Sequence, residues 1–304
     1  MRGPAVFPVG GLPGRVTIYE VGPRDGLQNE ADTVPTAVKA EFIKRLADCG
    51  LSVVEATSFV HPKWVPQLAD AAELLDAMVR LPGVRYPVLV PNERGLDRAL
   101  EAGVEEVAIF GSATETFAQR NLNRSVAESL AMFEPVAARA LSAGVRVRGY
   151  LSMCFGDPWE GAVPVAQVVS VGARLLEMGC FELSLGDTIG VATPNQVPEV
   201  ISPVVERAGV ERVALHFHDT RGTALANVLA ALQMGIRIFD SSAGGLGGCP
   251  YAPGAAGNLA TETLLYLLDG MGIRTGVDRR KVSEASRFIG GVLPATHEIR
   301  SSHE

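Results

Sequence analysis

The chain has 304 residues, of which 47% are hydrophobic and 20% charged, enough apolar material for the large core of one α/β barrel. Its formal net charge is −7 and its basic residues form no cluster, which argues against nucleic acid as a partner. It has no long apolar run, no recognisable targeting segment and four cysteines without CxxC spacing, so we expect a cytoplasmic protein that does not enter a membrane.

Short, apolar, β-branched runs alternate with longer amphipathic segments along the chain. Runs of this composition are typical of parallel strands buried on both faces. The predicted strands are Val16–Val21, Ser52–Ser58, Tyr86–Val90, Glu106–Phe110, Val145–Leu151, Phe181–Leu185, Arg212–His216 and Ile236–Ser241.

Helix signals follow the strands. The first such segment carries its apolar residues on one face, and Ser125 with Glu128 forms a capping box. Several segments stop at a glycine, as helices commonly do. The predicted helices include Thr36–Cys49, Ser125–Ser142, Pro164–Met178, Pro194–Ala208, Gly222–Met234 and Asn258–Asp269.

Eight strand–helix units favour a (β/α)8 TIM barrel, with an open doubly wound sheet as the alternative. We expect an N-terminal extension over residues 1–14, the barrel as the catalytic domain over residues 15–277, and a short C-terminal helical extension of the same domain over residues 278–304. In such a barrel the active site forms on the loops at the carboxyl ends of the strands.

Three of these loops carry side chains suited to binding a metal ion. Arg24 and Asp25 come directly after the first strand, in a turn made sharp by glycine and proline. His216 and His218 share a face at the end of the seventh strand, because alternate residues of a strand point the same way. Asn258 opens the helix after the eighth strand. Barrel closure places strand eight beside strands one and seven, so Asp25, His216, His218 and Asn258 can surround one ion.

This ligand set combines one carboxylate, two imidazoles and one amide oxygen. With room left for substrate oxygens, these donors suit octahedral Mg²⁺ or Mn²⁺. Zn²⁺ is the alternative because of the two histidines. Cys249 is the only cysteine close to these residues in sequence, so we do not expect thiolate ligation.

Three further carboxylates and one thiol lie at or near strand ends. An acid inside a barrel is costly unless it is paired, so each of these carboxylates needs a role. We predict a structural role for Glu20 and functional roles for Glu55 and Asp187. Cys249 lies in the glycine-rich loop after the eighth strand.

Five long motifs occur in order between about Val16 and about Gly276, namely VGPRDGLQNE, EATSFVHPKWVPQLAD, SLGDTIG, HFHDT and GLGGCPYAPGAAGNLATE. Together they resemble the 3-hydroxy-3-methylglutaryl-CoA lyases. These lyases belong to a wider superfamily of metal-dependent barrel lyases, aldolases and Claisen-condensing enzymes. The last motif, which contains the cysteine, distinguishes the lyases within that superfamily.

The resemblance implies a retro-Claisen cleavage of an acyl-CoA substrate into acetoacetate and acetyl-CoA. It implies the metal ligands named above, with Arg24 stabilising the enolate charge and Cys249 acting as a catalytic acid on a mobile loop. Glu55 and Asp187 are implied as further active-site acids.

The general base and the residues that bind the substrate are two further roles in that reaction. Either His216 or Asp187 is the base that removes the hydroxyl proton, and the sequence does not choose between them. Gln28, one turn beyond Arg24, joins that arginine in our expected substrate-binding set.

Alternatives stay open at this point. Residues 153–160 depart from the family pattern at the mouth of the site, which leaves a lyase for a longer branched 3-hydroxyglutaryl-CoA as the nearest one. More distant are a superfamily aldolase or condensing synthase, and a non-catalytic barrel that binds CoA or metal. A homodimer and a place in leucine degradation are compatible with the sequence, which decides neither.

Overall fold

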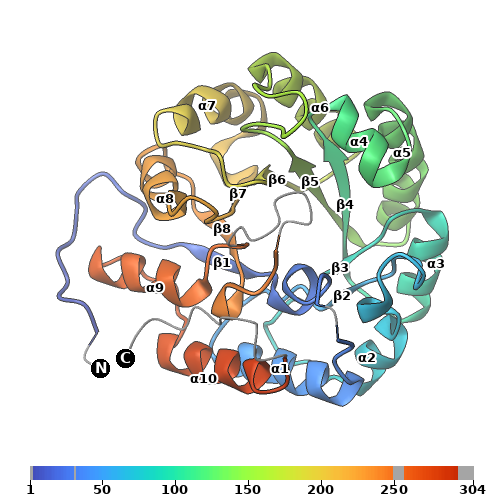
Figure 1. The fold of residues 1–304 in the computed structure, drawn as a ribbon, viewed down its shortest axis with the longest axis horizontal. Coiled ribbons are helices and arrows are strands. Elements are labelled where there is room, and N and C mark those ends of the chain that lie inside the picture. Colours follow the sequence, from blue (N-terminus) through green and yellow to red (C-terminus); the bar gives the residue numbers. More distant parts are fainter. Residues whose placement is uncertain (1–2, 31, 249–256, 294–304) are drawn as a thin grey trace.

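Eight parallel strands form a ring at the centre of the molecule, and helices surround them (Figure 1). The computed structural model describes residues 3–30, 32–248 and 257–293. The strands are β1 (Thr17–Glu20), β2 (Thr57–Ser58), β3 (Val88–Leu89), β4 (Glu106–Ser112), β5 (Arg146–Ser152), β6 (Glu182–Asp187), β7 (Val213–Phe217) and β8 (Ile238–Ser241).

The ring closes between the first strand and the segment before the second. The strands follow the order β1-β8-β7-β6-β5-β4-β3-β2. The amide of Glu20 donates to the carbonyl of Val53 at 3.2 Å, and the amide of Glu55 donates to the carbonyl of Glu20 at 2.8 Å. The predicted TIM barrel is therefore confirmed, and strand eight lies between strands one and seven.

The second strand is shorter than the sequence predicts. Only Thr57 and Ser58 form a continuous ladder with β3, whereas Val53 and Val54 pair through single bridges with Arg85 and Glu20. Successive residues of this segment therefore pair with different neighbours.

Ten α-helices lie in the described residues, and α1, α5, α6, α7 and α8 match the predicted helices closely. The helices are α1 (Thr36–Asp48), α2 (Ala71–Ala77), α3 (Glu93–Glu101), α4 (Glu115–Leu122), α5 (Val126–Ser142), α6 (Val165–Glu177), α7 (Gln196–Ala208), α8 (Ala224–Gln233), α9 (Thr261–Gly270) and α10 (Arg279–Gly290). Shorter turns are the π-helical η1 (Gly22–Gly26) and the 3₁₀ turns η2 (Pro66–Leu68), η3 (Val210–Arg212) and η4 (Ala243–Gly245).

Two helices depart from expectation. Helix α4 was not predicted, because it is short and buries only Phe117 and Ala118, so it leaves almost no periodic signal. Helix α9 begins at Thr261 rather than at Asn258, because Asn258 forms a β-bridge with His218. The expected helix-opening role of Asn258 is therefore wrong.

The described parts of the two predicted extensions lie against the outer helices. Residues 3–14 form no helix or strand, and the amide of Phe7 donates to the carbonyl of Gly270 at the end of α9. Helix α10 packs beside α1, where the guanidinium of Arg45 lies 4.3 Å from the ring centre of Phe288 (Figure 1). The domain boundaries at residues 15 and 278 stay predictions.

The apolar core lies between the sheet and the helices, and it includes the fully buried Phe42, Phe133 and Phe239. The interior of the ring instead holds charged side chains, among them Arg148 and Asp240, whose residues are 0% and 2% exposed. Within the described part of the chain, no helix combines the length and the apolar character that crossing a membrane requires.

Candidate active site

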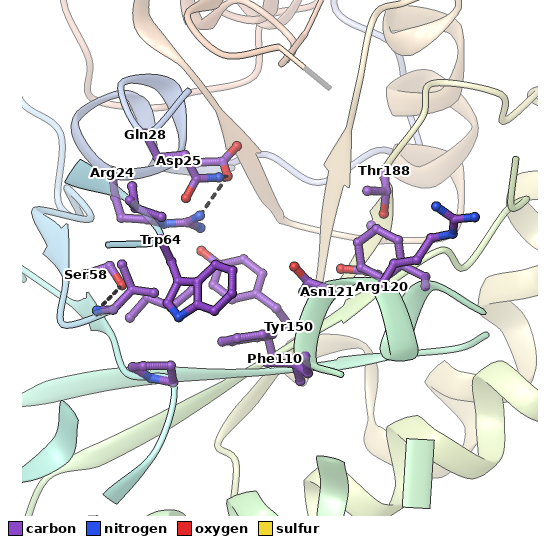
Figure 2. A pocket seen from close by; sticks show the side chains of 18 of the residues that line it. Arg24, Asp25, Gln28, Ser58, Trp64, Phe110, Arg120, Asn121, Tyr150 and Thr188 are labelled. Atoms are coloured by element: carbon purple, nitrogen blue, oxygen red, sulfur yellow. Dashed lines mark hydrogen bonds and ion pairs between the residues drawn. The ribbon is translucent and has the colours of Figure 1, made fainter. Parts of the chain in front are cut away.

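A cavity of about 700 Å³ opens at the carboxyl ends of the strands. Its walls include Arg24 and Asp25 after β1, Tyr150 of β5, and His216 and His218 at the end of β7. Figure 2 shows Arg24, Asp25 and Gln28 on one side of the cavity, with Arg120, Asn121 and Thr188 on the other.

The turn η1 brings two consecutive side chains, Arg24 and Asp25, into this cavity. The amides of Arg24, Asp25 and Gly26 all donate to the carbonyl of Val21, at 3.2, 2.8 and 3.1 Å, which makes the turn wider than an α-helical one. A Cβ atom at Gly26 would lie 2.9 Å from Cβ of Leu246. Close contact with the loop after β8 therefore requires glycine here.

Arg24 is held by two carboxylates. Its Nε and Nη2 atoms lie 2.8 Å from Oε2 of Glu55, and its Nη1 atom donates to Oδ1 of Asp25 at 2.7 Å. The hydroxyl of Tyr150 also donates to Oε2 of Glu55, at 3.1 Å. Burial opposes the charge of Arg24, but Glu55 and Asp25 outweigh it and raise the pKa of the guanidinium, so Arg24 is a fixed cation.

Asp25, His216 and His218 form a group that could hold a metal ion. One ligand atom from each lies within 4.8 Å of the others, and Nε2 of His216 is 4.0 Å from Oδ2 of Asp25. Asn258 joins them, because its Nδ2 donates to Oδ2 of Asp25 at 2.9 Å and to the carbonyl of Leu246 at 3.0 Å.

Two buried atoms in this group have no hydrogen-bond partner, Nδ1 of His218 and Oδ1 of Asn258. A buried polar atom left unpaired costs free energy, and both atoms are of types that bind divalent cations. The residues therefore fit a divalent ion. The four predicted ligands meet at one place in the fold.

The two histidines differ in charge preference. Burial lowers the pKa of His216, but a hydrogen bond and the charge of Asp240 outweigh it and raise the pKa overall. Burial, followed by repulsion from His216, lowers the pKa of His218 to about 3. His218 is therefore a neutral imidazole at physiological pH, as metal ligation requires.

Sequence reasoning missed Asp240. Its Oδ2 atom lies 3.3 Å from Nδ1 of His216, because the two residues are register partners of β8 and β7. Burial raises the pKa of Asp240, but Arg148 and His216 outweigh this and bring it to about 2. A carboxylate directly after Ile238 and Phe239 in the predicted strand 236–241 was the available signal.

The other predicted acids have different positions. Glu55 is fully buried behind Arg24. Both oxygens of Asp187 accept backbone hydrogen bonds, from Val191 at 2.8 Å and Ala192 at 3.1 Å, and the residue does not line the cavity. Burial raises the pKa of Asp187 to about 6.

Gln28, Glu20 and Cys249 are the remaining predicted residues. Gln28 donates to Oδ1 of Asp25 at 3.0 Å and lines the cavity. Glu20 accepts hydrogen bonds from the amides of Gly22 and Ala243, at 2.8 Å each, so it joins two loops as its structural role requires. Cys249 lies outside the described residues.

Comparison with known proteins places this site in a family. The HMGL-like family model matches residues 15–289. The chain belongs to the HMGL-like family. Its relatives include the mitochondrial hydroxymethylglutaryl-CoA lyase of Bos taurus, 54% identical over 95% of this chain and 89% of the relative. The cytoplasmic 3-hydroxy-3-methylglutaryl-CoA lyase of Rattus norvegicus is 54% identical over 92% of this chain and 81% of the relative.

Solved structures of HMGL-like proteins share the fold. The hydroxymethylglutaryl-CoA lyase of Pseudomonas aeruginosa superposes with a TM-score of 0.93 at 49% identity, covering 96% of this chain and 97% of that one. An HMG-CoA lyase of Acinetobacter baumannii, solved with coenzyme A and 3-methylmalate, gives 0.90 at 37% identity, covering 97% and 95%.

Proposed function

We propose that this HMGL-like enzyme is a carbon–carbon lyase that cleaves 3-hydroxy-3-methylglutaryl-CoA into acetoacetate and acetyl-CoA. The observation that carries the proposal is the meeting of Arg24 with Asp25, His216, His218 and Asn258 at the strand ends. Hydroxymethylglutaryl-CoA lyases that match this chain over most of its length support the same reaction.

The difficult step is the breaking of the C–C bond, which leaves its electron pair on the thioester enolate. Arg24 is a cation at all relevant pH values and lines the cavity with its charge held by Glu55 and Asp25. A positive group fixed in advance stabilises developing negative charge without reorganisation. We therefore place the enolate oxygen beside Arg24.

Asp25, His216, His218 and Asn258 would hold a divalent cation, Mg²⁺ or Mn²⁺, with Zn²⁺ as the alternative. When bound, the ion supplies Lewis acidity toward the hydroxyl and carboxylate oxygens of the substrate. Oδ1 of Asp25 faces Arg24 and Oδ2 faces the cation side, so this one carboxylate sets the distance between the guanidinium and the proposed cation site.

Two proton transfers complete the reaction. One removes the proton of the tertiary hydroxyl, and of the two predicted bases His216 lines the cavity whereas Asp187 does not. As a ligand, His216 would hold the cation beside the reacting hydroxyl and so help lower the pKa of that hydroxyl, and the lone pair it gives the cation is then not available for the proton. The second transfer delivers a proton to the enolate carbon, and we propose Cys249 as its donor, as the family resemblance implies.

The substrate class is an acyl-CoA, supported by the related structure that contains coenzyme A. We retain cytoplasm as the proposed location; relatives of this chain carry both cytoplasmic and mitochondrial names. A homodimer and a role in leucine degradation also remain proposals.

A substrate panel tests the function. The purified chain, stripped of metal with a chelator, should be inactive and should recover with Mg²⁺ or Mn²⁺. It should then convert 3-hydroxy-3-methylglutaryl-CoA into acetoacetate and acetyl-CoA, identified by mass spectrometry. Full activity of the stripped chain would remove the metal from the proposal. Faster cleavage of a longer branched 3-hydroxyglutaryl-CoA would change the substrate.

A further inference from the structure

We infer that Arg148 and Asp240 are positioning residues that fix the ring orientation and the tautomer of His216, and thereby set the affinity of the site for its cation. Neither residue lines the cavity, and both lie inside the barrel below it. The inference rests on the proposed metal site, and it extends that site to two residues on strands β5 and β8.

The carboxylate of Asp240 is surrounded by donors. Arg148 donates two hydrogen bonds to it in a bidentate arrangement, called the fork below, from Nη2 to Oδ1 at 2.7 Å and from Nη1 to Oδ2 at 3.1 Å. The hydroxyl of Ser184 donates to Oδ2 at 2.8 Å. Paired, charge-assisted hydrogen bonds of this kind fix a carboxylate in angle as well as in distance.

The arrangement decides which nitrogen of His216 carries the proton. An ionised carboxylate only accepts hydrogen bonds, so the 3.3 Å contact between Oδ2 of Asp240 and Nδ1 of His216 requires the proton on Nδ1. In the neutral ring Nε2 then has a free lone pair. That atom is the one 4.0 Å from Oδ2 of Asp25, on the cation side.

Arg148 itself is buried and has partners on several sides. It is 0% exposed, and its Nε donates to Oε1 of Glu182 at 2.7 Å. Its guanidinium lies 3.7 Å from the ring centre of Tyr19 and 4.7 Å from that of Tyr150. Burying an arginine with two carboxylates is costly, and such a network is commonly explained by the precision it gives to a site.

A chain of contacts thus runs from Glu182 through Arg148 and Asp240 to His216. Glu182 and Asp240 both bind the same guanidinium, but only Asp240 also touches the histidine. This difference supplies a matched pair of variants, each of which removes one carboxylate charge from Arg148 and keeps the side-chain size.

The test measures Mn²⁺ binding to the metal-free chain by calorimetry and by electron paramagnetic resonance, without substrate. Asp240→Asn places an amide N–H₂ against either the guanidinium or the imidazole, so it disrupts the fork or favours the other tautomer. We expect the Kd for Mn²⁺ to rise roughly 10–100-fold, the usual cost of losing a residue that orients a metal ligand. Glu182→Gln should change the Kd for Mn²⁺ by less than about threefold, because Glu182 contacts Arg148 but not His216.

Arg148→Lys separates positioning from charge balance. Lysine keeps the buried positive charge but cannot form the paired hydrogen bonds to Asp240. The Arg148→Lys chain should therefore bind Mn²⁺ more weakly than the natural chain even if it folds normally. The ¹⁵N shifts of the His216 ring provide a second readout in folded, metal-free protein. They should report a proton on Nδ1 in the natural chain and a mixture of tautomers in Asp240→Asn.

The outcomes distinguish this inference from the proposed function. If the natural chain binds no Mn²⁺, the proposed metal site fails. If it binds Mn²⁺ and folded Asp240→Asn binds equally well with an unchanged tautomer, the positioning role of Asp240 and Arg148 is wrong. Equal losses in Asp240→Asn and Glu182→Gln would also overturn it, because they would show a general effect on the barrel interior.

Discussion

The two sides of the active site are built differently, although Asp25 belongs to both. On the arginine side, Arg24 has a carboxylate partner for its Nε, Nη1 and Nη2 atoms. On the histidine side, His218 and Asn258 each keep a buried atom without a partner. On the arginine side, carboxylates of the protein itself balance the charge of Arg24, whereas the histidine side offers donor atoms that suit a cation. The first side should therefore govern the chemical step and the second should govern metal affinity.

The largest expected effect comes from Arg24→Met. Loss of the fixed cation should lower kcat by roughly 10²–10³, as does loss of a group that stabilises an oxyanion. Steady-state kinetics at saturating Mn²⁺ and substrate measure this effect, and calorimetry should show that Mn²⁺ still binds, because the four proposed ligands are intact. Arg174→Met, at an exposed helix surface, is the matched control. A variant with normal kcat and raised KM would show that Arg24 only binds substrate.

Cys249→Ser tests a contribution that belongs to neither side. A serine hydroxyl is a far weaker acid than a thiol, so kcat should fall by roughly 10², the lower range for acid–base catalysis, with metal content unchanged. Cys49→Ser is the control, since burial raises the pKa of Cys49 to about 12. Burial also raises the pKa of Cys154 and Cys180. Cys249 should therefore be the thiol that iodoacetamide modifies first, and near-normal turnover of the serine variant would contradict its catalytic role.

His218→Ala should act on metal affinity. Removal of a ligand atom should raise the Kd for Mn²⁺ by at least the roughly 10–100-fold that loss of an orienting residue costs. Part of the activity should return at high Mn²⁺, because Arg24 is untouched. His61→Ala removes another cavity-lining histidine that is not in the ligand group, and it should bind Mn²⁺ normally. An unchanged affinity in His218→Ala would remove this residue from the ligand set.

The smallest expected effect is a pH dependence of stability. The pKa of His218 is lowered from 6.5 to about 3 in the folded chain, so its unfolded form binds a proton first as the pH falls. Its contribution to stability is present above pH 6.5 and is lost between pH 6.5 and 3, with a slope of up to about one proton. Urea unfolding of the metal-free chain, repeated across this pH window, gives the free energy of unfolding at each pH. This free energy should change less steeply with pH for His218→Gln than for the natural sequence. Equal slopes would show that the proton uptake comes from other groups.

Much of this site could be predicted because its signals are local. The sequence shows an HxH at a strand end, an Arg-Asp after the first strand and eight strand–helix units, and closure of the barrel brings the predicted ligands together. The partner of His216 was not readable, because Asp240 lies beside it only through the register of two strands. The side chain of Asp187 was equally hidden, since its partners are the backbone amides of its own loop.

The contacts of η1 have a consequence for folding. Gly26 packs against Leu246, and Asp25 accepts a hydrogen bond from Asn258, 233 positions further along the chain. The reactive centre therefore assembles only when the first and last strands meet. Contacts so distant in sequence form late in folding, because the entropy cost of closing a long loop comes before the contact can stabilise the chain. During refolding, helical circular dichroism should return before enzymatic turnover does, and the delay between the two signals measures the time the barrel takes to close.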